Sequence, residues 1–568
     1  EIIYKLLINF GIEKSLSLIE GMFSFLFYNI HTKKIIAARD KFGQKPLFIF
    51  EDNNDLIFSS SLNSINLIKG SLKLNNDAIK NYIFSQGHIT PRQTFFKEIV
   101  PLYAGHYLII DDQKRKINRY FLVENLVGNE YLNISENEAT EELSKILSNS
   151  VNEHLNADCK VGILASGGID SMLINSFARD HKKDITCFTK LSSDIEKIPL
   201  LVSKTLISDF SIQKIYPKSS DYLSRLIDYI EFGGRPAPWG GGPPLMDLCK
   251  RAKTMDFKVL LSGDCVDEFS AGYKPSIKTL ENFRNDFTKP DHLCLGKYCD
   301  DKSSFLGYQF NLRERIMKNM NKSSSQILDY FRINSCQNIE FHLQETNLPH
   351  SDTFSMFESI ELRNPFLDIE FVKFVLNCGI DKIYQNWNNK DKTGKFILKK
   401  IAYKKYASNF NEEYFLNKEG TRNYSYFISN QEFWNFGNFL SLEILNLEIP
   451  FLDDWKLIFN LINLEIFLNI FLKKESKDVY LKNILSDKGK IVIGIENRLG
   501  LKYIMGARDD HHGFQDVMIY GEDFAERFFG EDYLEARRCL VHSLPEYEAM
   551  LRTAGFQNIK FFVAIPDY

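Results

Sequence analysis

Six consecutive residues, Ser166–Ser171 (SGGIDS), have backbone and side-chain groups that could bind a phosphate. The apolar run VGILA precedes them and a second apolar run follows, which predicts a strand, a glycine turn and a helix. Glycine lets the backbone approach an anion closely, and the N–H groups at a helix N-terminus attract negative charge. The hydroxyl groups of Ser166 and Ser171 could donate further hydrogen bonds to the same phosphate.

Asp170 lies within this segment and carries the same sign of charge as a phosphate. We therefore expect it to bind Mg²⁺, because a metal ion between a carboxylate and a phosphate interacts favourably with both anions. The alternative is an ordinary Gly-Gly turn in which Asp170 caps the helix. The sequence contains neither G-x-x-x-x-G-K-[ST] nor G-x-G-x-x-G, so a Walker P-loop and a dinucleotide-binding fingerprint are excluded.

A second segment, Val259–Tyr273 (VLLSGDCVDEFSAGY), also begins as an apolar strand that ends in Ser-Gly. It then presents three acids, Asp264, Asp267 and Glu268. In a doubly wound sheet, the carboxyl ends of two strands can meet at one ligand crevice. We therefore expect this segment to face the first one and to help hold magnesium on the phosphates of ATP. An acidic loop exposed to solvent is the alternative.

The elements around these segments predict an α/β protein with several domains. Residues 1–125 contain short apolar or alternating runs separated by Asn, Asp, Gly and Pro, as strands and turns do. Residues 126–140 are polar and are predicted to form a linker. From residue 141, helix-like and strand-like runs alternate, which predicts a parallel sheet, and residues 275–472 are mostly helix-like. A third composition begins near residue 478.

The chain has 568 residues, enough for about three or four domains of roughly 150 residues. Its formal net charge of −4 gives no electrostatic reason to expect a nucleic-acid partner. The nine cysteines form no C-x-x-C pair, so we expect reduced thiols and a cytoplasmic protein rather than a zinc ribbon or a disulfide framework. The most membrane-like run, Trp455–Leu472, contains Lys456, Glu465 and three Asn, which predicts a buried packing helix and no membrane span.

Several segments resemble those of known enzymes. SGGIDS resembles the pyrophosphate-binding loop of N-type ATP pyrophosphatases, and LLSGDCVDEFSAGY resembles a segment of glutamine-dependent asparagine synthetases. DTFSMFESIELRNPFLD (352–368) is similar to a further signature of that family, and KTGKFILKK with LNKEG resembles its late phosphate-contacting lysines. GMFSFLFYN and AARDKFGQKPLFIF resemble the second half of a class II glutaminase domain. The order of these segments over residues 1–472 matches the family.

The resemblance implies the domain organisation. Residues 1–125 would form a partial class II glutaminase domain, a β-rich sandwich of the N-terminal nucleophile type. Residues 141–472 would form a doubly wound α/β ATP pyrophosphatase domain, of the adenine nucleotide α hydrolase type, with a helical C-terminal part. Residues 478–568 resemble the C-terminal half of a class I methyltransferase-like protein, a partial α/β tail. This tail lacks the Gly-rich first loop of that fold, so we expect no methyl transfer.

The resemblance also implies an ATP-dependent amide ligase. ATP with Mg²⁺ would adenylate the side-chain carboxylate of aspartate, and ammonia from glutamine would then give asparagine, AMP and pyrophosphate. The implied partners are these small molecules and a possible homodimer. Asp264 would be the catalytic base, and Asp170 and Asp267 would be the metal ligands. The residues implied to bind the nucleotide and its phosphates are Leu164, Ser166, Gly167, Gly168, Asp170, Ser171, Ser262, Gly263, Lys395 and Lys418. For the two lysines, a solvated surface position is the alternative.

The sequence departs from the family near the expected acceptor. Cys265 and Val266 replace small glycines, Ser270 replaces an aromatic residue and Thr353 replaces an arginine. Residues 233–244 (GGRPAPWGGGPP) are predicted to form either a binding loop near the acceptor or an ordinary surface loop. We therefore weigh a second acceptor against aspartate, such as a sugar acid of a surface glycan.

The glutaminase part is expected to be incomplete. A class II glutaminase uses an N-terminal cysteine as its nucleophile, and this sequence has no cysteine before Cys159. We expect a segment before Glu1 to be missing, and we expect the chain as written to use free ammonia and not glutamine. A further interpretation is an inactive gene fragment or fusion.

Overall fold

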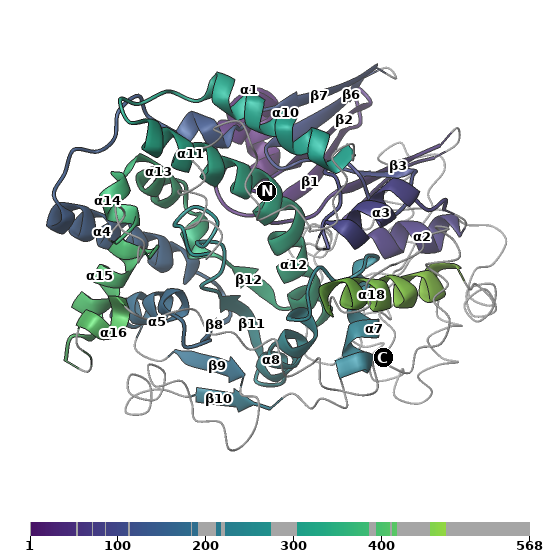
Figure 1. Cartoon of the computed structure of the whole chain (residues 1–568). Coiled ribbons are helices and arrows are strands. Elements are labelled where there is room, and N and C mark those ends of the chain that lie inside the picture. Colours follow the sequence, from purple (N-terminus) through teal and green to yellow (C-terminus); the bar gives the residue numbers. More distant parts are fainter. Residues whose placement is uncertain are drawn as a thin grey trace.

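The computed structural model describes the chain in a series of ranges: 2–52, 55–70, 72–85, 87–111, 114–182, 185–190, 212–216, 222–273, 304–385, 393–408, 410, 412–416 and 455–472. These residues form an N-terminal region (residues 2–126), a parallel-sheet region (residues 136–416) and one further helix (Figure 1). Lys418 and the tail predicted at 478–568 lie outside the described residues.

The N-terminal region contains two antiparallel sheets, in the strand orders β1-β2-β6-β7 and β4-β3-β5. Side chains of both sheets, including Ala37, Leu108, Ile49 and Phe58, share one hydrophobic core. The two sheets therefore pack face to face as a sandwich, in agreement with the β-rich pattern of the sequence. The strands are β1 (Ser24–Asn29), β2 (Lys34–Arg39), β3 (Phe48–Glu51), β4 (Leu56–Ser59), β5 (Ile99–Pro101), β6 (His106–Asp111) and β7 (Lys114–Arg119).

Helices α1 (Ile2–Leu18), α2 (Leu62–Lys69) and α3 (Asn76–Phe84) also belong to this region, and the strand-and-turn pattern does not predict them. Ser61 and Asn75 are the N-caps of α2 and α3. Their side chains accept hydrogen bonds from backbone N–H groups in the first turn of each helix, and Ser and Asn are favoured at N-cap positions for this reason.

The parallel-sheet region begins with α4 (Glu136–His154), which starts five residues before the helix-like run found in the sequence. Ser135 and Glu138 form a capping box, in which the Ser135 hydroxyl accepts from the Glu138 N–H at 3.2 Å and the Glu138 carboxylate accepts from the Ser135 N–H at 2.8 Å. This reciprocal pair satisfies two backbone donors that a helix start would otherwise leave unpaired.

The sheet itself has the strand order β10-β9-β8-β11-β12, and every neighbouring pair is parallel. Along β11, Val259 and Leu261 belong to the hydrophobic core on one face and Leu260 to the core on the other. Parallel strands are buried on both faces in this way when helices cover both sides. The strands are β8 (Lys160–Leu164), β9 (Thr186–Lys190), β10 (Ile212–Ile215), β11 (Phe257–Leu261) and β12 (Glu361–Arg363).

Helices α4 and α5 (Ile169–His181) contribute side chains to the first of these cores, and α7 (Tyr222–Gly233) and α8 (Gly242–Thr254) contribute to the second. The rest of the region is mostly helical, as the sequence predicts for residues after 275. It comprises α10 (Ser304–Asn319), α11 (Gln326–Asn338), a π-helix (Ile339–Asn347), α12 (Leu348–Phe357), α13 (Ile369–Asn377), α14 (Ile380–Ile383), α15 (Phe396–Tyr406) and α16 (Glu412–Leu416).

The last described helix, α18 (Trp455–Leu472), packs against α3 of the N-terminal region and α7 of the parallel-sheet region (Figure 1). Leu464, Phe467 and Leu468 are fully buried, and the Asn460 side chain donates to the carbonyl oxygen of Tyr82 at 3.2 Å. The prediction of a buried packing helix is therefore confirmed. Within the described ranges, none of the helices combines the length and apolar character that crossing a bilayer requires.

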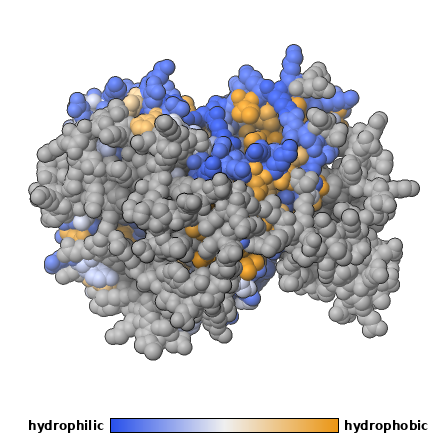
Figure 2. All heavy atoms as spheres, turned by 45° about the vertical axis from the view of Figure 1, so that its right-hand side comes forward, coloured by the Kyte–Doolittle hydropathy of each residue, from blue (hydrophilic) through white to orange (hydrophobic). Residues whose placement is uncertain are grey.

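The described surface on the face in Figure 2 is mostly hydrophilic, with hydrophobic side chains gathered in a few groups. The cysteines that the structure describes are free thiols: Cys159, Cys187, Cys249, Cys265, Cys336 and Cys378.

Candidate active site

The SGGIDS segment joins β8 to α5 at the carboxyl end of the sheet. Gly167 has a φ of 77°, in the left-handed region that glycine adopts without steric cost. Ser166 is exposed, and its hydroxyl lies 3.0 Å from that of Ser171 and accepts from the Gly168 N–H at 3.3 Å. The N-cap of α5 is Gly168, without a side-chain cap, so the alternative in which Asp170 caps the helix is wrong.

The acid segment follows β11, which is the direct neighbour of β8 in the sheet. The Ser262 hydroxyl donates to the Asp264 carboxylate at 2.7 Å, and it accepts from the Asp264 N–H at 3.2 Å. Desolvation by the surrounding protein raises the pKa of Asp264, although the Ser262 hydrogen bond opposes the rise. Because the Asp264 side chain is still exposed, solvent keeps this shift smaller than full burial would make it.

The two segments are in direct contact through Gly263. A Cβ atom at this position would collide with the backbone nitrogen of Ser171 and with the carbonyl carbon of Asp170. Only glycine fits so close an approach, which explains the Ser-Gly pair at the end of β11. The sequence predicts this side-by-side arrangement, while the individual roles of the residues stay predictions.

Lys395 lies between the two acids that the sequence assigns to a metal ion. Its Nζ donates to Asp170 Oδ2 at 2.6 Å and forms an ion pair with Asp267. The backbone N–H of Lys395 donates to the carbonyl oxygen of Ser270 at 3.0 Å, which ties the start of α15 to the acid segment. Burial tends to lower the pKa of Lys395, but the negative charges of Asp170 and Asp267 have the larger effect and raise it. Lys395 therefore stays protonated. The alternative of a solvated surface lysine is therefore wrong for Lys395.

The residues at this place fit a divalent cation next to phosphate. Asp170 Oδ1 is buried and has no hydrogen-bond partner among the described residues. Gly272 leaves space beside Asp267, since a Cβ there would overlap the Asp267 carboxylate. The described ranges contain no group of three or more His, Cys, Asp or Glu side chains that could hold a metal ion. Phosphate oxygens and water would therefore supply the other ligands, as Mg²⁺ prefers.

Leu164 is the last residue of β8, and its side chain is buried in the hydrophobic core. It can therefore reach a nucleotide only through its backbone. Together with the glycine segment, the acid segment and Lys395, it lies where the carboxyl ends of parallel strands form a ligand site in open α/β sheets. The arrangement suits the binding of a polyphosphate beside the carboxylate of Asp264.

Two protein-family models match this chain. Residues 142–409 match the family model for asparagine synthase. Residues 1–121 match the model for a glutamine amidotransferase domain. The chain is similar to asparagine synthetases.

Three curated asparagine synthetases illustrate the similarity. Asparagine synthetase [glutamine-hydrolyzing] 1 of Bacillus subtilis is 25% identical over 429 residues, covering 69% of this chain and 66% of the relative. The second such enzyme of B. subtilis is 27% identical and covers 63% of this chain and 51% of the relative. A putative asparagine synthetase of Methanocaldococcus jannaschii is 29% identical and covers 47% and 52%. The chain thus spans less than two thirds of the length of these relatives.

Two departures from the asparagine synthetase pattern have structural counterparts. Cys265, where the resemblance expects glycine, is buried and has a φ of 75°, a conformation that costs a non-glycine residue roughly 1–2 kcal/mol. Thr353, where it expects arginine, donates its hydroxyl to the Pro349 carbonyl oxygen at 2.7 Å, and its methyl group lies beside Gly233. Residues 233–244 include the end of α7 and the start of α8, with a short connection between them.

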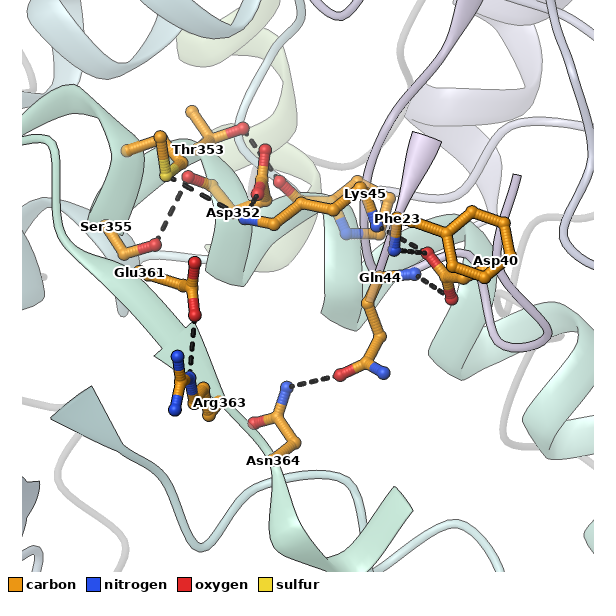
Figure 3. A network of polar contacts seen from close by, with 12 residues as sticks. Phe23, Asp40, Gln44, Lys45, Asp352, Thr353, Ser355, Glu361, Arg363 and Asn364 are labelled. Carbon is orange, nitrogen blue, oxygen red and sulfur yellow. Dashed lines mark hydrogen bonds and ion pairs between the residues drawn. The ribbon is translucent and has the colours of Figure 1, made fainter. Parts of the chain in front are cut away.

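The two parts that match the asparagine synthase and amidotransferase models are joined by a buried ion pair (Figure 3). Lys45 Nζ lies 3.1 Å from Asp352 Oδ1, and both side chains are mostly buried. The backbone at Lys45 is held by Asp40, whose carboxylate accepts from the N–H groups of Gln44 and Lys45 at 3.0 Å each. Asp352 is the first residue of the D-T-F-S-M signature, so the sequence marks it as a candidate. Its partner Lys45 could not be identified from the sequence.

Figure 3 also shows a second ion pair, on strand β12. Arg363 Nε donates to Glu361 Oε1 at 2.6 Å, and the same guanidinium donates to the carbonyl oxygens of His154 and Asn156. This pair fixes the end of α4 to the sheet beside β11. The carbonyl oxygen of Arg363 also accepts from the N–H of Ser262 at 2.9 Å, which ties β12 to the start of the acid segment.

Replacing Lys45 by Met is expected to lower the free energy of unfolding by about 3 kcal/mol, because the buried Asp352 carboxylate loses its counter-charge. Thermal unfolding of the variant, of Asp352→Asn and of the double variant would measure this. In the double variant most of the loss should be recovered, because no unpaired charge remains. Strictly additive losses would show that the two side chains do not interact.

Proposed function

We propose that the chain is an ATP-dependent amide ligase of the asparagine synthetase type, which forms an acyl-adenylate and converts it to an amide with ammonia. The observation that carries the proposal is the contact between the glycine segment and the acid segment at the ends of β8 and β11. This contact supports the proposal, because adenylation followed by aminolysis requires hydroxyl and N–H donors, a cation and a carboxylate base around one position.

In the first step, the carboxylate of the acceptor attacks the α-phosphate of ATP and pyrophosphate leaves. The N–H groups of Gly167 and Gly168 and the hydroxyls of Ser166 and Ser171 would bind the leaving pyrophosphate. Asp170 and Asp267 would hold Mg²⁺, which supplies positive charge for the phosphate oxygens. Once a metal ion and ATP are present, Lys395 would be released from the acids to pair with phosphate.

In the second step, ammonia attacks the acyl carbon and AMP leaves. The attacking nitrogen must lose a proton, and Asp264 would accept it as general base. The raised pKa of Asp264 suits this role, since a more basic carboxylate accepts a proton more readily. The protein would hold ammonia close to the acyl carbon and so reduce the entropic cost of the encounter.

Aspartate is the acceptor that the similarity favours, with asparagine as product. Thr353 supports a second candidate, another acid such as a sugar acid. Its side chain is short, uncharged and bonded to its own helix, so it offers no positive charge to the acceptor. Cytoplasmic location and a homodimer belong to the same proposal.

Pyrophosphate release from Mg-ATP tests this function, with ammonium chloride as nitrogen source and aspartate present or absent. Ammonium is chosen because the sequence has no cysteine before Cys159 to release ammonia from glutamine. Aspartate-dependent release with formation of asparagine supports the proposal. Binding of Mg-ATP without release would direct the search to other acids. Absence of any ATP binding would overturn the proposal in favour of an inactive fragment.

A further inference from the structure

The connection between α7 and α8 is held in place from two sides. Its residues Pro236, Ala237 and Pro238 are buried. Tyr82, on α3 of the N-terminal region, donates its hydroxyl to the carbonyl oxygen of Ala237 at 2.6 Å, and the Ala237 N–H donates to Asn463 Oδ1 of α18 at 3.3 Å. The alternative of an ordinary surface loop is therefore wrong, and the connection presents its side chains from a fixed backbone.

Arg235, on this connection, is linked to the acid segment through the π-helix. Its guanidinium donates to the carbonyl oxygen of Glu345 on the π-helix at 3.4 Å. Two residues further along the same helix, the Asn347 side chain donates to Glu268 in the acid segment. The π-helix therefore places Arg235 on the side of the acid segment that carries the predicted base, Asp264.

The positive charge of Arg235 is not neutralised by an ion pair among the described residues. The side chain is half-buried, and its Nε is buried without a hydrogen-bond partner in the described part of the chain. Burial raises the pKa of Glu345, and the guanidinium groups of Arg39, Arg235 and Arg92 oppose the rise. One carboxylate cannot neutralise three guanidinium groups, whatever its own protonation state. Because arginine stays charged at physiological pH, this position favours an anionic occupant.

Arg235 also lies beside Thr353, the residue that stands where the resemblance expects an arginine. Gly233 is close to both side chains, since a Cβ atom there would be 3.0 Å from Thr353 Cγ2 and 3.6 Å from Arg235 Cγ. Thr353 has no charge to offer, so the arginine expected on α12 is absent from this chain. Arg235 supplies a guanidinium to the same neighbourhood from a different element.

We propose that Arg235 determines the acceptor class by binding a second anionic group of the acceptor, apart from the carboxylate that is adenylated. This inference rests on the proposed function, because it names the acceptor of the same site. The planar guanidinium can offer two parallel N–H donors to a carboxylate. The acceptors would then be dicarboxylic acids, which include aspartate, and acids with one anionic group would bind weakly.

A phosphate of ATP has the same anionic chemistry as a carboxylate. The acceptor is the favoured source, because the predicted phosphate-binding groups lie elsewhere, in the SGGIDS segment and at Lys395, whereas Thr353 belongs to the signature expected near the acceptor. The experiments below distinguish the two sources.

The first test compares thermal unfolding of the full chain in succinate and in propionate at equal ionic strength. Propionate is succinate without the second carboxylate. We expect the melting temperature of the parent chain to be about 2 °C higher in succinate, because a ligand that binds only the folded state stabilises it. Dianions also stabilise proteins non-specifically, so the measured quantity is the part of this difference that Arg235→Gln removes.

Arg251→Gln is the matched control, since Arg251 is an exposed arginine on α8 whose guanidinium donates to the Gln213 side chain at 2.9 Å. It should keep the full difference between the two acids. Arg235→Lys should keep part of it, because the positive charge remains. Equal melting temperatures of the parent chain in both acids would overturn the proposal. So would a difference as large in Arg235→Gln as in the parent chain.

Kinetics separate this role from a structural one and from contact with ATP. In an active chain, Arg235→Gln should raise KM for aspartate about tenfold or more and leave KM for Mg-ATP and for ammonium unchanged. β-Alanine, which is aspartate without the α-carboxylate, should be used equally poorly by the parent chain and the variant. Loss of Mg-ATP binding in Arg235→Gln, with the preference for succinate retained, would assign Arg235 to a phosphate and overturn the proposal.

The fate of this inference can be told apart from that of the proposed function. An active chain whose KM for the acceptor is unchanged in Arg235→Gln would overturn the inference and leave the proposed function intact. An inactive chain with an Arg235-dependent preference for succinate would contradict the proposed function alone.

Discussion

The Asp170→Asn variant is expected to lose pyrophosphate release by about 100-fold or more, because it removes a carboxylate that would hold the cation on the leaving group. Asparagine keeps the shape of the side chain but not its charge. The variant should also lose the strong ion pair with Lys395, whose Nζ lies 2.6 Å from Asp170 Oδ2. Initial rates of pyrophosphate release at increasing Mg²⁺ concentration would measure the loss.

The magnesium dependence decides what the loss means. Higher Mg²⁺ should recover part of the rate if Asp170 is a metal ligand, because weaker binding is overcome by concentration. The matched control is Asp180→Asn, an exposed carboxylate on the same helix that pairs with Lys405 at the surface. Its rate should equal that of the parent chain. Retained activity in Asp170→Asn would remove Asp170 from the site.

The Asp264→Asn variant is expected to separate the two chemical steps. Amide formation should fall by about 100-fold or more, the usual size of a general-base contribution, while adenylation should change only a few-fold. Exchange of labelled pyrophosphate into ATP reports adenylation, and product analysis reports the amide. Because the pKa of Asp264 is raised, the amide step of the parent chain should lose rate on acidification before an ordinary aspartate would be protonated.

The control for this variant is Asp256→Asn, which changes an exposed acid at the opposite end of β11. It should leave both steps unchanged. Equal losses of adenylation and amide formation in Asp264→Asn would indicate a role in binding the metal ion or positioning the substrate. That outcome would contradict the assignment of Asp264 as base.

The sequence predicts the parallel sheet and the meeting of its two loops well, because both depend on local patterns. A Ser-Gly pair follows each of the strands β8 and β11, and the carboxyl ends of parallel strands lie on one edge of the sheet. The start of α4 and the helices α2 and α3 were harder to predict, because their capping residues, Ser61, Asn75 and Ser135, also occur in turns.

Individual side-chain contacts between distant segments could not be predicted. Lys395 is 225 residues from Asp170 in the sequence, and Lys45 is 307 residues from Asp352. No periodicity or spacing relates such pairs, and each becomes visible only once the chain is folded. The same holds for Glu268, where a π-helix brings His342 and Asn347 to the acid segment.

The position of α18 has a consequence for the order in which the molecule can be completed during translation. Its Asn460 side chain donates to the backbone of Tyr82, a partner made 378 residues earlier. At about 5–20 residues per second, a ribosome needs roughly 20–75 s to make that stretch. Throughout this interval α18 is not yet made, so the apolar side of α3 stays uncovered. A chaperone that shields this side during synthesis would therefore raise the yield of folded protein.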